Sequence, residues 1–120
     1  MSQPPTHPSP LSLSAGELVQ RLQAGEPLQL VDVREERELA IARLPSPVEH
    51  LALSRSGEWM EEIATRLKQE HPVVVLCHAG VRSWQFACWL METQGYRDVW
   101  NLQGGIDAWS VEVDPSIPRY

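Results

Sequence analysis

One cysteine of the sequence stands where a thiol could act as a nucleophile. Cys77 ends a short apolar run, Val73 to Leu76, and precedes a turn with Gly80 and then the pattern of a helix. Open α/β sheets bind their ligands at the carboxyl ends of their strands. The unpaired amides and the dipole of a following helix favour negative charge there, and the thiolate is the reactive form of cysteine. The pattern therefore predicts that Cys77 is a nucleophile.

The loop that follows Cys77 offers the groups that such chemistry needs. It consists of His78, Ala79, Gly80, Val81, Arg82 and Ser83. Backbone amides around Gly80 can form an anion-binding nest, and Arg82 adds a cation. Gly80 is expected to need a positive φ or a close backbone approach. We therefore predict that residues 78–83 bind the substrate, with Arg82 contacting the anion or pairing with a carboxylate. His78 either polarises the substrate or faces solvent.

The two cysteines receive opposite interpretations. A free cysteine is more often a small buried apolar side chain, and this remains the alternative for Cys77. The turn after Cys77 favours the catalytic role. Cys88, between Ala87 and Trp89, is predicted to be part of the helix core. It lies about two to three helical turns beyond Cys77, too far for an unstrained disulfide.

The composition is that of one globular domain. The chain has 120 residues, 42% of them apolar and 22% charged. Its net charge of -6 argues against nucleic acid or an anionic membrane as a partner. No run is long and apolar enough for a membrane span and no signal-peptide pattern opens the chain, so we expect a cytoplasmic protein. The histidines show no ligand spacing, and neither a metal nor a cofactor is expected. Four tryptophans are expected in the core or a pocket wall: Trp84, Trp89, Trp100 and Trp109.

Helical and strand patterns alternate along the chain, which predicts an α/β fold with a mainly parallel sheet and helices on both faces. The expected strands are 28–33, 48–53, 73–76 and 98–102. The expected helices are 14–25, which opens with a capping box from Ser14 to Glu17, then 34–38, 59–69, 83–94 and 106–109. Residues 1–10 are predicted to be flexible, residues 11–112 to form the domain and residues 113–120 to be a loose tail.

Two charged residues near the end of the strand 28–33 are candidates for supporting roles. Asp32 is predicted chiefly to cap the following turn or to fix Arg34, and otherwise to lie on the rim of the site. Arg34 is expected either to bind an anion in the pocket or to form an i,i+4 ion pair with Glu38.

Four motifs, in their order and spacing, resemble the single-domain rhodanese family from about residue 12 to residue 110. They are Leu30–Arg34 with Glu38 and Leu39, Ile41–Pro45, the loop motif Val73–Ser83, and Leu102–Trp109. The resemblance implies a three-layer fold around a five-stranded sheet. It also implies a thiosulfate sulfurtransferase-type enzyme, in which Cys77 takes the outer sulfur of a donor such as thiosulfate as a persulfide. Cyanide, a thiol or a sulfur-accepting protein then receives the sulfur.

Two alternative functions remain beside this interpretation. One is a non-enzymatic sulfur-relay or regulatory module that hands the same persulfide to a partner. The other is an arsenate reductase or phosphatase of the same fold, which would place five residues between cysteine and arginine. Here four intervene, His78 to Val81, and the tighter ring should suit a sulfane sulfur. The sequence departs from the family at residues 42–47, which puts the substrate preference in doubt more than the activity.

Overall fold

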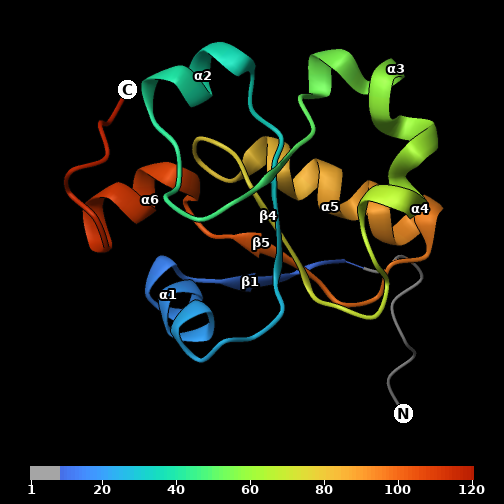
Figure 1. The fold of residues 1–120 in the computed structure, drawn as a ribbon, viewed down its shortest axis with the longest axis horizontal. Helices are drawn as coiled ribbons and strands as arrows, with labels where there is room; N and C mark the ends of the chain where they lie inside the picture. Colours follow the sequence, from blue (N-terminus) through green and yellow to red (C-terminus); the bar gives the residue numbers. More distant parts are fainter. Residues whose placement is uncertain (1–8) are drawn as a thin grey trace.

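The computed structural model describes residues 9–120, and its centre is a five-stranded sheet (Figure 1). The strand order is β1-β5-β4-β2-β3 and every pairing is parallel. The strands are β1 (Leu11–Leu13), β2 (Gln29–Asp32), β3 (Glu49–His50), β4 (Val73–Leu76) and β5 (Val99–Leu102). The predicted α/β fold with a parallel sheet is therefore confirmed. The flexibility predicted for residues 1–10 falls almost wholly outside the described residues.

The central strand β4 separates two apolar layers. Val73, Val75 and Cys77 face one cluster, while Val74 and Leu76 face the other. The first cluster includes side chains of α3 (Ser56–Trp59), α4 (Ile63–Arg66) and α5 (Val81–Gln94). The second includes side chains of α1 (Ala15–Gln23) and α6 (Gly105–Glu112). This alternation is the period of two of a strand, buried on both faces, and it gives the three layers.

Local sequence signals place the first helix correctly. Ser14 and Glu17 form the predicted capping box, in which each side chain accepts a hydrogen bond from the other residue's backbone N–H. The edge strand β1 just before it was not predicted, because three residues are too few to show an alternating pattern. Within residues 9–120, no helix is long and apolar enough to cross a membrane.

Two predicted helices differ from the structure. The segment 59–69 is not one helix but a succession of short turns: α3, a 3₁₀ turn at Met60–Glu62, and α4. Its apolar stripe is only partly buried, since Met60 is 43% exposed while Ile63 lies in the core. The helix α2 (Glu36–Ile41) begins after Arg34, because the Arg34 N–H donates to Asp32 Oδ1 and forms a turn there.

The segment 113–120, predicted to be a loose tail, is instead packed onto the domain. Ile117 is 7% exposed, and its carbonyl accepts a hydrogen bond from Ser110 Oγ. Arg119 forms an ion pair with Asp107 of α6. Figure 1 shows that the segment runs back from α6 until its end lies beside α2. The prediction was wrong because Pro115 and Pro118 limit regular structure without preventing tertiary packing.

Candidate active site

The loop after β4 is built around the sulfur of Cys77. The Gly80 N–H donates to Cys77 Sγ over 3.1 Å, and the Ser83 N–H does so over 3.4 Å. The Ser83 hydroxyl lies 3.2 Å from the same sulfur. The two amide donors belong to the first turn of α5 and the turn before it, where helix amides have no intrahelical partner. Amides at the N-terminus of a helix favour negative charge on groups beside them.

The backbone of Gly80 makes this cradle possible. Its φ is +105°, a conformation that side chains rarely adopt, and it is the N-cap residue of α5. The expected need for glycine is therefore confirmed. Asn101 of β5 holds the loop at two points: its Nδ2 donates to the Gly80 carbonyl, and its Oδ1 accepts from the Ser83 hydroxyl. Sequence reasoning missed Asn101, although a polar residue inside an apolar strand was a signal.

The N-terminus of α6 clamps the loop from its other side. The amide of Ile106 donates to the Cys77 carbonyl over 2.9 Å, and that of Asp107 donates to the His78 carbonyl over 3.1 Å. Gly105, between this helix and the loop, has a φ of +61°. A Cβ atom there would lie 2.4 Å from both the Cys77 and the His78 carbonyl oxygens. Glycine at position 105 therefore permits this close approach of the helix to the loop.

Arg82 pairs with a carboxylate, one of the two roles that the sequence left open. Its Nη1 and Nη2 donate to the two oxygens of Glu38 over 2.8 and 2.9 Å. Glu38 is 9% exposed, and its hydrogen bonds with Arg82 lower its pKa to about 2 despite its burial. The pKa of Arg82 is raised, chiefly by Glu38 and to a lesser degree by Cys77 and Tyr120. A bidentate pair of this kind fixes the plane of the guanidinium beside the loop.

Arg34 is a buried structural residue, and the predicted ion pair with Glu38 is wrong. Its side chain is fully buried and forms its ion pair with Asp32. The remaining N–H groups donate to the carbonyls of Glu38 and Ala42 and to the Tyr120 hydroxyl. Burial lowers the pKa of Arg34, but hydrogen bonds to Asp32 and Tyr120 outweigh that effect and leave it raised. Asp32 thus fixes Arg34, as predicted, and Arg34 has no donor left for an anion.

The rim of the loop is partly apolar. Val81 is 66% exposed and Trp84 is 38% exposed, so Trp84 does not lie in the core, one of the two positions expected for it. The ring of His78 stacks on that of Tyr120, with centroids 4.2 Å apart and planes 13° apart. The fully solvent-facing His78 that the sequence also allowed is therefore not observed.

The second cysteine does not take part in this arrangement. Cys77 and Cys88 are both free thiols, and Cys88 lies half-buried on α5. Its pKa is raised by burial and by the charge of Glu92. Over the described part of the chain, no group of three or more candidate ligands could hold a metal ion.

The features above define an α/β protein that holds a thiol in a loop of backbone amides at the carboxyl edge of a parallel sheet. The sequence profile of the Rhodanese-like domain family matches residues 14–112, and the chain belongs to that family. A crystal structure of a rhodanese-like domain protein from Staphylococcus aureus has the same fold. Its TM-score is 0.71 at 24% identity, and the match covers 92% of this chain and 98% of the other.

Two relatives illustrate the contexts in which such a domain occurs. A protein named sulfurtransferase from Allochromatium vinosum is 36% identical over 101 residues, which cover 82% of this chain and 86% of that protein. Rhodanese-like/PpiC domain-containing protein 12, chloroplastic, of Arabidopsis thaliana is 47% identical over 92 residues, which cover 77% of this chain. The match spans only 30% of the Arabidopsis protein, so there the similar region is one part of a longer chain.

Proposed function

We propose that the protein is a rhodanese-type sulfurtransferase that carries a sulfane sulfur as a persulfide on Cys77. The observation that carries the proposal is the pair of backbone amides, of Gly80 and Ser83, that donate to Cys77 Sγ. Membership of the rhodanese-like family and the sulfurtransferase name of the Allochromatium relative support it.

The first step is attack on the sulfur donor. The Cys77 thiolate attacks the outer sulfur of thiosulfate, a new S–S bond forms, and the S–S bond of the donor breaks. Sulfite leaves with the electron pair, and the negative charge now rests on the terminal sulfur of the persulfide. Amides at the start of α5 stabilise that charge, and Arg82 adds a cation beside it.

The second step returns the enzyme to its starting state. Cyanide or a thiolate attacks the terminal sulfur, the persulfide S–S bond breaks, and Cys77 leaves as a thiolate. The acceptor carries away one sulfur as thiocyanate or as a new persulfide, so no external oxidant or reductant is consumed. Because donor and acceptor react in turn at one sulfur, ping-pong kinetics follow.

The size of the loop favours sulfur over phosphate or arsenate as the group transferred. Four residues separate Cys77 from Arg82, and the loop closes so tightly that its amides reach the cysteine sulfur itself. Cys77 is 1% exposed, which leaves little free surface beside the sulfur. As the group held covalently on Cys77, a single sulfur atom therefore suits the site better than a phosphoryl or arsenate group.

The test combines mass spectrometry with a turnover assay. After thiosulfate treatment, the intact protein should gain the mass of one sulfur atom, on Cys77, and it should convert cyanide to thiocyanate. Cys77→Ser should show neither reaction, and Cys88→Ser should show both. An active Cys77→Ser variant, or wild-type protein that gains no sulfur from any small donor, contradicts the proposal.

The exposed apolar rim favours a second candidate, transfer to a protein acceptor. Val81 and Trp84 flank the loop and offer contact area that a small acceptor does not need. Stable persulfide on Cys77 without turnover of cyanide or small thiols would select this relay role. Rapid thiocyanate formation would select the enzyme.

A further inference from the structure

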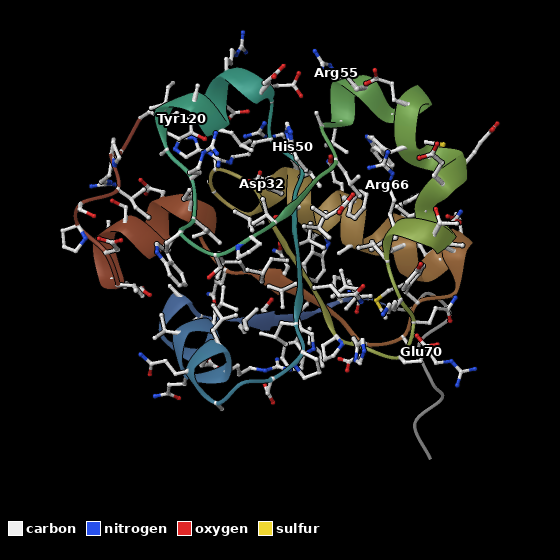
Figure 2. The ribbon with its side chains drawn as sticks, in the orientation of Figure 1. Asp32, His50, Arg55, Arg66, Glu70 and Tyr120 are labelled. Carbon is white, nitrogen blue, oxygen red and sulfur yellow. The ribbon has the colours of Figure 1, made fainter. Side chains whose placement is uncertain are left out.

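Tyr120, at the end of the sequence, contacts three of the charged or loop residues described above. Figure 2 shows its side chain beside α2, and the hydrogen bonds join it to both Arg34 and Glu38. Its ring stacks on His78, the residue that directly follows Cys77. No motif of the sequence pointed to this residue, and the proposed chemistry does not use it.

The hydroxyl of Tyr120 has one possible orientation. Arg34 Nη1 can only donate, so the hydroxyl oxygen accepts from it over 2.9 Å. Glu38 is ionised above its pKa of about 2 and can only accept, so the hydroxyl proton is donated to Glu38 Oε1 over 2.9 Å. Burial raises the pKa of Tyr120, so the hydroxyl keeps this proton at neutral pH. Tyr120 therefore links a buried cation to the carboxylate.

The same carboxylate oxygen holds the cation of the loop. Glu38 Oε1 accepts from Arg82 Nη2 as well as from the Tyr120 hydroxyl. Arg34, at the other end, is tied to Asp32 in the sheet. A continuous series of hydrogen bonds thus runs from β2 through Tyr120 and Glu38 to Arg82.

Contacts outside the loop at residues 78–83 also hold the segment that carries Tyr120 in place. The preceding segment is anchored by the buried side chain of Ile117 and by the ion pair between Arg119 and Asp107. The stack on His78 therefore joins a ring on an anchored segment to a residue of the loop. The ring restricts His78, and the hydroxyl restricts Glu38.

We propose that Tyr120 is a positioning residue of the Cys77 site, which orients Arg82 through Glu38 and holds His78 by stacking on its ring. This inference rests on the proposed function for its role in turnover. The positioning of Arg82 by Tyr120 can be tested without that function, because orienting the Arg82 cation changes the reactivity of Cys77 toward any electrophile.

Two substitutions separate the contacts of Tyr120. Tyr120→Phe keeps the ring over His78 and removes both hydrogen bonds of the hydroxyl. Tyr120→Ala removes the stack as well. Tyr96→Phe is the matched control, because it deletes a buried hydroxyl whose partners are the carbonyls of Ile63 and Leu67, away from the Cys77 loop.

The activity-independent readout is the rate at which iodoacetamide alkylates Cys77 in a Cys88→Ser background at pH 7. Thermal unfolding first establishes that the variants are folded. Tyr120→Phe should then slow alkylation about threefold to tenfold, while Tyr96→Phe should leave the alkylation rate unchanged. Glu38→Gln should also slow the alkylation of Cys77. The double variant Glu38→Gln with Tyr120→Phe should react no more slowly than Glu38→Gln alone, since both substitutions act through the same carboxylate.

Turnover provides the second readout. In the thiosulfate assay, kcat/KM should fall about tenfold in Tyr120→Phe and further in Tyr120→Ala. If the wild-type protein forms no persulfide, the proposed function is refuted. The comparison of alkylation rates then still decides the role of Tyr120. Tyr120→Phe alkylation within a factor of two of wild type, or full additivity with Glu38→Gln, overturns the inference.

Discussion

The two thiols of this protein lie along one stretch of chain and have opposite surroundings. Cys77 precedes α5 and receives hydrogen bonds from the Gly80 and Ser83 amides. Cys88 lies within the same helix, where burial and Glu92 raise its pKa and oppose the thiolate. The difference teaches that position relative to the end of the helix decides which hydrogen-bond donors and charges surround each thiol. Amides are free to bind an anion only in the first turn.

The largest expected effect tests this contrast directly. Cys77→Ser should lower sulfur transfer from thiosulfate to cyanide at least about a thousandfold, because a serine hydroxyl is a much weaker nucleophile toward sulfur. Cys88→Ser should stay within about twofold of wild type. Thiocyanate formation measures both. A Cys88→Ser protein that is folded but inactive would reverse the roles of the two thiols.

The packing of α6 against the Cys77 loop can be disrupted without replacing the cysteine. Gly105→Ala should destabilise the protein by several kcal/mol, since the new methyl group would collide with the Cys77 and His78 carbonyl oxygens. Gly25→Ala is the matched control, because Gly25 also has a positive φ, +78°, but no atom within 4 Å of the added Cβ. It should lose only about 1 kcal/mol from backbone strain. Urea unfolding compares the two, and equal losses would contradict the clamp.

The contribution of the Glu38 carboxylate charge to stability can be tested by varying the pH. The pKa of Glu38 falls from 4.5 to about 2 on folding, so its ionised form stabilises the protein above pH 4.5 and the effect is lost as pH falls toward 2. The contribution is on the order of 3 kcal/mol. Glu38→Gln should lose this amount at pH 7, and the stability gap to wild type should narrow between pH 5 and 2.

The exposed ion pair of Asp107 with Arg119 supplies the control for that experiment. Its partners are solvated, so Asp107→Asn should change stability far less than Glu38→Gln at neutral pH. Denaturant unfolding across the pH range measures all three proteins. A pH-independent gap between Glu38→Gln and wild type would show that the carboxylate charge does not contribute.

The smallest expected effect concerns Cys88 alone. In a Cys77→Ser background, iodoacetamide should alkylate Cys88 slowly at pH 7 and faster only above pH 9, because its pKa is raised from 9.0. Glu92→Gln should move the profile to lower pH by removing the nearby negative charge. Mass spectrometry of quenched time points gives the rates. Rapid alkylation at neutral pH would remove the contrast between the two thiols.

Sequence patterns predicted the parts of the site that lie close together in the chain. Residues 73–83 carry a buried strand, a cysteine and a glycine turn in succession, so local signals were enough to place Cys77, Gly80 and the start of α5. The capping box at Ser14 was found for the same reason. Each is a pattern within a few residues whose conformational preference is strong.

The remaining parts depend on contacts between distant segments. The i,i+4 spacing offered Arg34 as the partner of Glu38, and only the fold shows that this carboxylate binds Arg82, while Arg34 is held by Asp32. Tyr120 followed two prolines in a segment without periodicity, so nothing local revealed its place. Partner choice among charged side chains is a tertiary property, and helical spacing alone does not decide it.

The parallel order β1-β5-β4-β2-β3 has a consequence for how the Cys77 site assembles during folding. Strands that pair in parallel require long crossover connections, and the site draws residues from Glu38, Cys77, Asn101 and Tyr120. Chains dominated by such distant contacts fold slowly compared with helical bundles. During refolding, helical circular dichroism should therefore recover before sulfur transfer does, and the enzymatic assay reports the closing of the whole sheet.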